Sequence, residues 1–247
     1  TASTACSLVL QEEGLRPDIV AGHSLGEYSA LVAAEAVSFA DAVRTVRQRG
    51  RFMQEAVPLG EGAMAAILGL DEDRIKAVCV EVGSRDGTVE AVNFNCPGQT
   101  VIAGAAKAVE AAVDALKAAG AKRAVMLNVS APFHSTLMKP AAERLAEVLD
   151  TIVIKDAKVP VAANVDGQLE TAADVIKASL VRQAASPVLW IACVRQIQAF
   201  GAENIVEVGP GKTLTGFNRK IDKAIHCENV EDIPSLKKTL EFFQGGN

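Results

Sequence analysis

Short apolar stretches alternate with stretches rich in Ala, Leu and charged residues along most of the chain, and this alternation limits the possible folds more than any other feature. Within residues 61–130, GAMAAILGL, VEAVNFN, QTVIAGA and KRAVMLNVS have the composition of strands. DEDRIKAVCVEV follows the first of them and KAVEAAVDALKAAG follows the third, and both have the composition of helices. The predicted order is βαββαβ, which is ferredoxin-like.

The alternation resumes after this segment, so residues 61–130 are predicted to be a small subdomain inserted into a larger one. The flanking residues, 1–60 and 131–247, contain the strand-like stretches RPDIVAGHS, VPVAANV and ENIVEVGPG between helix-like segments. Strands that alternate with helices favour a mainly parallel sheet with helices on its faces. We therefore expect an α/β protein with a large and a small subdomain.

Charge and hydropathy argue against several classes of protein. The 25 basic and 30 acidic residues give a net charge of -5, which offers no uniform positive field to a nucleic acid. No apolar run reaches the roughly 18 residues of a membrane span, and the amino end lacks the order of a secretory signal. Five cysteines without a C-x-x-C pair predict neither a disulfide framework nor a metal site. We expect no nucleic-acid or membrane partner, and a cytoplasmic location.

Residues 21–30, AGHSLGEYSA, contain Gly-x-Ser-x-Gly at Gly22, Ser24 and Gly26. A strand-like segment precedes the pattern, and an Ala- and Leu-rich segment with Glu27 in its first turn follows it. A serine at such a turn presents its hydroxyl above the sheet, and the next backbone N–H points at an incoming oxyanion. The pattern favours a nucleophilic serine, and a glycine-punctuated structural turn is the alternative.

A nucleophilic serine needs a base, and the chain has 3 histidines. His23 adjoins Ser24 in an extended segment, so its side chain should point to the opposite face. No motif surrounds His226. His134 lies in SAPFHST, in a loop after the last strand of the inserted subdomain, and loops at strand ends are where sites are assembled. We predict His134 as the base, with capping of the following helix as its alternative role.

The segment SFADAVRTVRQRGRFMQEAV is periodic like an amphipathic helix, and Ser38 and Asp41 give it a capping-box-like start. At about 100° per residue, Arg49 falls in the middle of an apolar stripe that includes Met53, whereas Arg47 lies opposite. A guanidinium that faces the interior should be paired. Its partner is either a structural carboxylate or a substrate carboxylate, which arginine binds through two parallel hydrogen bonds.

The stretch GPGKT, residues 209–213, resembles the end of a phosphate-binding loop. That motif requires glycine at position 206, where this chain has Val206. We therefore expect a glycine-rich strand-to-helix turn and no nucleotide site.

Seven stretches are spread in order over nearly the whole chain: GHSLGEYSAL, RGRFMQEAVP, GAMAAILGL, VNFNCPGQTVIAG, VSAPFHSTLMKPA, LVRQAASPVLW and EVGPGKTLTG. Together they resemble the malonyl-coenzyme A:acyl carrier protein transacylase family of fatty acid synthesis. The resemblance implies a hydrolase-like α/β large subdomain with a ferredoxin-like insertion, in agreement with the order predicted above. The family also has a leading segment with a Gly-Gln-Gly loop, whose glutamine amide forms half of the oxyanion hole, and we expect this chain to begin after it.

The resemblance also implies catalytic roles. Ser24 is the acyl-accepting nucleophile, and His134 is its base. A main-chain carbonyl orients the histidine in place of an aspartate, and the matching position is Gln183. The Leu25 N–H forms the other half of the oxyanion hole.

For the substrate, the resemblance implies that Arg49 clamps the malonyl carboxylate. Phe133, directly before the base, is typical of members that select malonyl over methylmalonyl, and Met53 is also assigned to substrate binding. Lys122 and Arg123 lie where positive charge could meet coenzyme A phosphates or an acidic carrier protein, although a solvated basic pair is the alternative.

The implied reaction is a ping-pong transfer of malonyl from malonyl-coenzyme A to the phosphopantetheine thiol of acyl carrier protein, through a malonyl-serine. No cofactor and no metal is implied, and we expect a monomer. Two alternatives remain open. The first is a serine hydrolase or thioesterase, which shares the serine turn, and the second is a non-catalytic module that docks a carrier protein.

Overall fold

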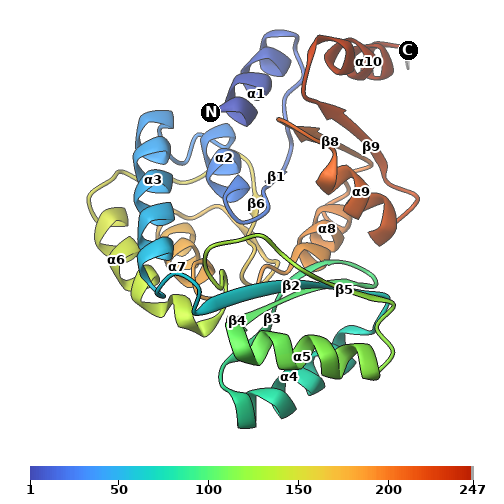
Figure 1. The fold of residues 1–247 in the computed structure, drawn as a ribbon. Helices are drawn as coiled ribbons and strands as arrows, with labels where there is room; N and C mark the ends of the chain where they lie inside the picture. Colours follow the sequence, from blue (N-terminus) through green and yellow to red (C-terminus); the bar gives the residue numbers. More distant parts are fainter. Residues whose placement is uncertain (246–247) are drawn as a thin grey trace.

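The inserted segment forms a four-stranded antiparallel sheet with two helices on one face (Figure 1). In the computed structural model, which describes residues 1–245, its elements are β2 (Gly62–Leu68), α4 (Glu72–Asp86), β3 (Val89–Cys96), β4 (Gln99–Ala105), α5 (Ala106–Ala118) and β5 (Arg123–Met126). The strands lie in the spatial order β3, β4, β2, β5. The predicted βαββαβ order is thus confirmed.

Apolar periodicity explains how α4 and α5 cover this sheet. Asp71 caps α4 by accepting a hydrogen bond from the N–H of Asp73 at 2.9 Å. The buried positions of the two helices recur every three or four residues, as on one face of a helix: Ile75, Val78, Cys79, Val82, Ala108, Val109, Ala112, Val113 and Leu116. They pack on the β2 residues Ala65 and Ile67, so this part of the chain has its own core.

The opposite face of the same sheet is buried as well. Met64 alternates with Ala65 along β2, and it packs with Val92 and Val101 on the face away from the two helices. Phe133, which precedes His134 in the chain, is partly buried against this cluster. The sheet is therefore covered by its own helices on one face and by the rest of the chain on the other.

The flanking parts of the chain supply the remaining elements. These are α1 (Ala2–Glu12), β1 (Val20–Ala21), α2 (Gly26–Ala33), α3 (Phe39–Glu55), η1 (Thr136–Met138), α6 (Lys139–Leu149), β6 (Val161–Ala162), β7 (Leu169–Glu170), α7 (Ala173–Gln183), α8 (Trp190–Ala199), β8 (Asn204–Val208), α9 (Thr213–Ile221), β9 (His226–Val230) and α10 (Ile233–Gln244). One apolar cluster joins α2, α3, α6 and α7, and another joins α8, α9 and β9.

The strands of this larger part form two sheets in the described residues, where the sequence predicts one mainly parallel sheet. β1 and β6 are parallel, β7 is antiparallel to β6, and β8 and β9 form a separate parallel pair. A cavity of about 910 Å³, lined by residues of α1, β1, α2, α8 and β8, lies between the two sheets. β1 covers only Val20 and Ala21 of the predicted strand RPDIVAGHS, because the chain enters the tight turn at Gly22 directly after Ala21.

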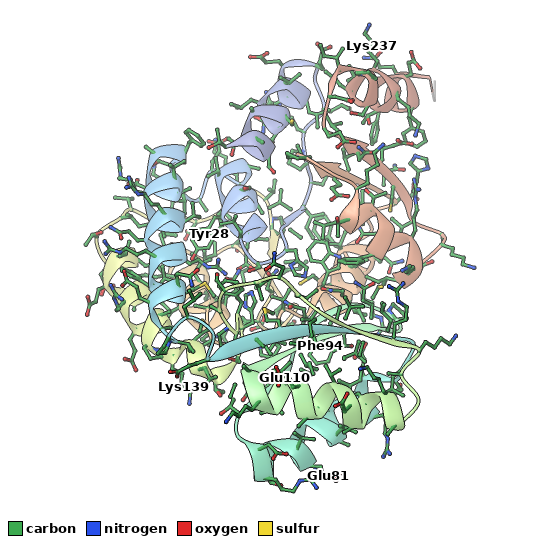
Figure 2. All side chains as sticks on the ribbon, viewed as in Figure 1. Tyr28, Glu81, Phe94, Glu110, Lys139 and Lys237 are labelled. Atoms are coloured by element: carbon green, nitrogen blue, oxygen red, sulfur yellow. The ribbon has the colours of Figure 1, made fainter. Side chains whose placement is uncertain are left out.

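The inserted segment lies at one end of the molecule, and the flanking parts make up the rest (Figure 1). Helices α4 and α5 lie at one end and α1 and α10 at the other (Figure 1). Charged side chains such as Glu81 and Lys237 point outward at these ends, whereas Tyr28 lies in the interior (Figure 2). None of the helices in residues 1–245 combines the length and apolarity needed to cross a membrane.

Candidate active site

Ser24 lies in the turn between β1 and α2, with a left-handed backbone conformation of φ 51°. The turn is very tight on its inner side. A Cβ at Gly22 would lie 2.0 Å from the carbonyl carbon of Gly26, so position 22 has room only for glycine. At Gly26 an added Cβ would meet nothing within 4 Å. The first glycine of the motif is therefore required by close backbone approach, and the second is not.

The Ser24 hydroxyl contacts a histidine that lies 110 residues away in the chain. The Oγ of Ser24 is 2.6 Å from Nε2 of His134. Nδ1 of the same ring is 3.0 Å from the main-chain oxygen of Gln183, which ends α7. A carbonyl oxygen can only accept, so Nδ1 carries the hydrogen and Nε2 is the acceptor for the serine hydroxyl. His134 itself is held in a left-handed conformation, with φ 65°.

His134 is poised as a neutral imidazole. Its pKa is lowered to about 3, mainly by burial, and the nearby Arg49 guanidinium acts in the same direction. The hydrogen bond to Gln183 acts in the opposite sense and is the smaller effect. At neutral pH the ring can therefore accept a proton from Ser24.

Arg49 points into this site from α3, as its helical periodicity predicted. Its side chain is only 6% exposed, whereas Arg44, Arg47 and Arg51 of the same helix are exposed. Nη2 of Arg49 donates to Ser24 Oγ at 3.0 Å and to the side-chain Oε1 of Gln183 at 3.1 Å. The guanidinium therefore touches the hydroxyl that would carry an acyl group.

No carboxylate in the described residues forms an ion pair with Arg49. Its Nε atom is buried and has no hydrogen-bond partner among residues 1–245. The ring of Tyr28 lies 5.8 Å from the guanidinium carbon, and burial lowers the pKa of Arg49. An anionic group placed beside Ser24 would supply the missing partner.

The other expected residues are Leu25, Met53 and Phe133, which adjoin these groups along the chain or the helix, and the surface pair Lys122 and Arg123. Leu25 is the N-cap residue of α2 and is 54% exposed. Met53 is fully buried one helical turn after Arg49, and Phe133 is partly buried next to the base. Lys122 and Arg123 are exposed at the start of β5 and lie on the surface.

Two buried side chains at the turn were missed by the sequence analysis. Asn164, two residues after the end of β6, hydrogen-bonds the backbone on both sides of His23, at Gly22 and Ser24. The side chain of Gln183 contacts Ser24 and Arg49, in addition to the main-chain contact already described. Burial raises the pKa of the neighbouring Glu27 carboxyl to about 7. A polar residue in an apolar strand-like stretch, VPVAANV, was the available signal for Asn164.

The two other histidines have structural contacts. Nε2 of His23 is 2.8 Å from Oδ1 of Asn95, and its ring packs beside Trp190 with 5.7 Å between the ring centroids. Its side chain thus turns away from Ser24, as expected. His226, at the start of β9, stacks on Phe242 of α10, and its Nε2 lies 3.0 Å from Oε1 of Glu228.

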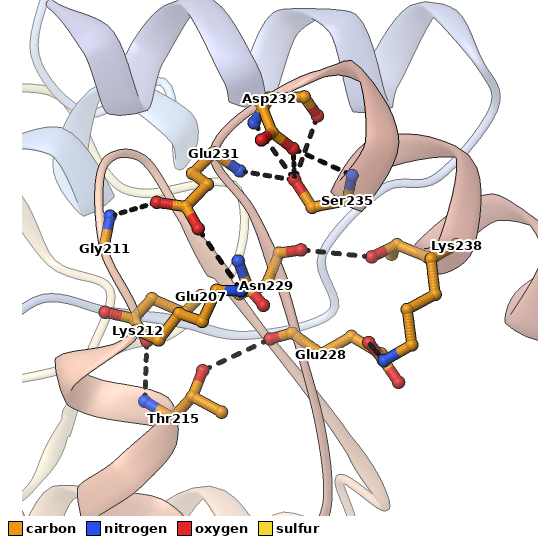
Figure 3. A network of polar contacts seen from close by, with 11 residues as sticks. Glu207, Gly211, Lys212, Thr215, Glu228, Asn229, Glu231, Asp232, Ser235 and Lys238 are labelled. Carbon is orange, nitrogen blue, oxygen red and sulfur yellow. Dashed lines mark hydrogen bonds and ion pairs between the residues drawn. The ribbon is translucent and has the colours of Figure 1, made fainter.

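The GPGKT turn leads into α9, and backbone N–H groups of the turn and of the start of α9 donate to carboxylates of the protein (Figure 3). Glu207 accepts hydrogen bonds from the N–H of Leu214 and Thr215, and Glu231 accepts from the N–H of Gly211. Carboxylates thus occupy the positions at which a phosphate would bind. The turn is structural, as the missing glycine predicted. No cluster of three metal-ligating side chains occurs in the part of the chain that the structure describes.

A serine at a strand-to-helix turn whose hydroxyl is hydrogen-bonded to a neutral histidine is typical of enzymes that transfer acyl groups through a serine ester. The family model of the acyl transferase domain matches residues 2–245. Malonyl CoA-acyl carrier protein transacylases of Bacillus subtilis and Escherichia coli are 49% and 51% identical to this chain. These alignments cover 100% and 98% of the chain, and 78% of each relative.

Solved structures agree with the sequence relatives. An acyl-carrier-protein S-malonyltransferase of Burkholderia pseudomallei superposes with a TM-score of 0.95 at 49% identity, over 97% of this chain and 78% of that one. A malonyl-transacylase in complex with a type II PKS acyl-carrier protein also gives 0.95 at 49% identity, over 98% and 78%. The chain belongs to the acyl transferase family, within the malonyl CoA-acyl carrier protein transacylases.

Proposed function

We propose that this enzyme transfers a malonyl group from malonyl-coenzyme A to the phosphopantetheine thiol of an acyl carrier protein. The observation that carries the proposal is the buried guanidinium of Arg49, which lies 3.0 Å from Ser24 Oγ and has no carboxylate partner in the described residues. An acyl group that ends in a carboxylate would satisfy it. The names of the relatives and the complex with a carrier protein support the same donor and acceptor.

In the first half-reaction the Ser24 oxygen attacks the thioester carbon of malonyl-coenzyme A. His134 takes the hydroxyl proton, and the Leu25 N–H stabilises the oxyanion that forms. The carbon–sulfur bond then breaks, and the coenzyme A thiol leaves with the proton from His134. The product is malonyl-Ser24.

In the second half-reaction the carrier-protein thiol attacks the serine ester. His134 removes the thiol proton and returns it to the Ser24 oxygen when the ester bond breaks. The Gln183 main-chain oxygen accepts from Nδ1–H at 3.0 Å and so keeps Nε2 directed at Ser24 in both half-reactions. The two products leave in separate steps, so the kinetics are ping-pong, and neither step needs a cofactor.

Arg49 selects the acyl group in this scheme. It binds the malonyl carboxylate through parallel hydrogen bonds, and Phe133 and Met53 provide the apolar surface beside it. The exposed pair Lys122 and Arg123 contributes positive charge for the phosphates of coenzyme A or for an acidic carrier protein.

The proposal extends to the architecture. Residues 61–130 are a ferredoxin-like small subdomain, and residues 1–60 and 131–247 are a hydrolase-like large subdomain. Their separate apolar clusters support this division. We further propose a monomer that acts in the cytoplasm.

Intact-protein mass spectrometry after brief exposure to malonyl-coenzyme A tests the function. We expect one added malonyl group on Ser24, its removal on addition of carrier protein that bears phosphopantetheine, and no adduct in Ser24→Ala. Release of the adduct to water at the same rate without carrier protein would favour the hydrolase alternative. If wild-type protein forms no adduct but binds carrier protein, the docking-module alternative is correct.

A further inference from the structure

Both peptide groups of Ser24 are held by buried side-chain amides. Side chains rarely adopt the left-handed conformation that Ser24 has, and such conformations persist where surrounding contacts determine them. Position 24 is a serine and lacks the conformational freedom of glycine, so contacts with the rest of the fold must hold its backbone. They are supplied by Asn164 and Gln183, which lie 140 and 159 residues from Ser24 in the chain.

Asn164 holds the chain on the amino side of Ser24. Its Oδ1 accepts from the Ser24 N–H at 2.7 Å, and its Nδ2 donates to the Gly22 oxygen at 2.7 Å. Its own N–H donates to Oε2 of Glu27 in α2 at 2.9 Å. The side chain is fully buried, so no solvent contact competes with these bonds. Asn164 thus ties the end of β1 and the start of α2 to the segment after β6.

Gln183 holds the chain on the carboxyl side of Ser24. Its Nε2 donates to the main-chain oxygen of Ser24 at 3.0 Å, and the Glu27 N–H donates to the same main-chain oxygen at 3.2 Å. That oxygen belongs to the peptide group whose N–H is that of Leu25. A trans peptide is planar, with its C=O and N–H on opposite sides, so the fixed oxygen also fixes the direction of the N–H. A hydrogen bond to the oxygen also polarises that N–H as a donor.

We propose that the amide side chains of Asn164 and Gln183 are positioning residues that hold the peptide groups of Ser24 so that the Leu25 N–H is aligned in advance with the reaction oxyanion. The inference rests on the proposed role of Ser24 as nucleophile. Gln183 then contacts three working groups with three different atoms: Ser24 through Nε2, Arg49 through Oε1 and His134 through its main-chain oxygen. Gln183, at the end of α7, thereby fixes the positions of His134, Arg49 and the Leu25 N–H relative to one another.

An alkyl fluorophosphonate tests this positioning without any use of malonyl. The Ser24 Oγ displaces fluoride from phosphorus, and the hydroxyl proton passes to His134. The Leu25 N–H stabilises the charge on the phosphoryl oxygen. Asn164→Ala removes the contacts on one side of Ser24. Gln183→Ala removes the side-chain contact on the other and keeps the main-chain oxygen. Asn218→Ala is the matched control, since Asn218 is equally buried and its amide oxygen accepts from Trp190 Nε1 at 3.0 Å.

We expect phosphonylation to slow by at least about tenfold in Asn164→Ala and in Gln183→Ala, a part of the roughly 10²–10³-fold cost of a lost oxyanion donor. Asn218→Ala should stay within about twofold of wild type, even if all three variants lower the melting temperature, since a buried hydrogen bond is lost in each. For malonyl transfer, Asn164→Ala should lower kcat and leave KM little changed. Two variants are used so that a failure of one to fold still leaves the other as a test.

The inference is overturned if both amide variants react at the wild-type rate, if the control slows as much as they do, or if wild-type protein does not react. A wild-type enzyme that reacts with the fluorophosphonate but never with malonyl-coenzyme A refutes the proposed donor. In that case slow phosphonylation of the two amide variants still supports the positioning role.

Discussion

At the scale of single residues, the contacts of Arg49 distinguish its two possible roles, a structural ion pair and the binding of a substrate carboxylate. A structural arginine forms an ion pair within the fold, whereas no carboxylate of residues 1–245 forms an ion pair with Arg49. The Glu27 carboxyl acts on it only at longer range, and its hydrogen bonds go to Ser24 and Gln183. Burial without a counterion is unfavourable for a guanidinium. On the proposed function, we therefore expect Arg49 to stabilise the site most when an anionic acyl group is bound and to disfavour neutral acyl groups.

Arg49→Ala should therefore lower kcat/KM for malonyl transfer by roughly 10- to 100-fold, the equivalent of the 1.5–3 kcal/mol typical of a hydrogen bond to a charged group. Acetyl transfer should be retained or rise, because the unpaired charge is gone. Arg49→Lys should recover only part of the malonyl activity. Measured kcat/KM for both donors decides the outcome, with the exposed Arg47→Ala as control. An unchanged ratio of malonyl to acetyl activity would refute the clamp.

His134 predicts the response to acid. Because burial lowers its pKa to about 3, the native ring stays neutral between about pH 3 and 6.5, whereas the unfolded ring takes up a proton below about 6.5. The unfolded state binds more protons in this window, so the stability contribution present above 6.5 is lost as pH falls toward 3. His134→Gln should flatten this dependence in urea titrations. A variant with the same slope between pH 4 and 6.5 as wild type would show that the native ring is not buried in its neutral form.

At the scale of elements, the turn between β1 and α2 depends on contacts with residues that are distant in the chain. Its left-handed serine is bound by the segment after β6 and by the end of α7. Helix α2 contributes little amphipathic character, since Glu27 and Tyr28 are buried together with Ala30 and Leu31. The helix is stable because it is surrounded by the fold, and its buried carboxyl serves as an acceptor for the Asn164 N–H.

The two glycines of the motif should respond differently to substitution. Gly22→Ala would place Cβ 2.0 Å from backbone atoms of Gly26, so we expect it to destabilise the protein by about 1–3 kcal/mol or more, as overpacking does. Gly26→Ala adds a better helix former into open space and should stabilise it by up to about 1 kcal/mol. Urea unfolding of both variants measures this. Equal losses of stability in the two would contradict the tight inner side of the turn.

At the scale of the whole molecule, the proposed division into two subdomains depends on where the apolar cores lie. The cluster between α4, α5 and the sheet is complete within residues 61–130. The cluster on the other face, with Met64, Val92 and Val101, also contacts Phe133 from the larger part. The small part therefore has its own core and one apolar face that the larger part covers.

Residues 61–130 produced alone should fold cooperatively, because a domain with its own core can do so. The exposed face should make it less stable than the intact chain and cause it to bind a hydrophobic dye. Met64→Gln should reduce the dye binding and keep the fold, since Met64 points away from the helices. Circular dichroism on heating checks this. The absence of a cooperative transition in both forms would contradict the proposed subdomain.

The sequence by itself determined the local features. The βαββαβ order follows from periodicities within short segments, and so does the inward direction of Arg49 on α3. The Gly-x-Ser-x-Gly turn was also visible, because its backbone needs glycine at a particular position. In each case the physical cause lies within a few residues in the chain.

Only the tertiary structure decided what these features touch. Ser24 meets His134, Gln183 and Asn164 across 110 to 159 residues, and no periodicity encodes such contacts. The separation of the expected single sheet into two depends on which strand edges pair in space. The neutral state of His134 depends on burial by the assembled fold, since an exposed imidazole would titrate near its ordinary pKa. Packing sets these properties because it brings distant groups together and removes water from between them.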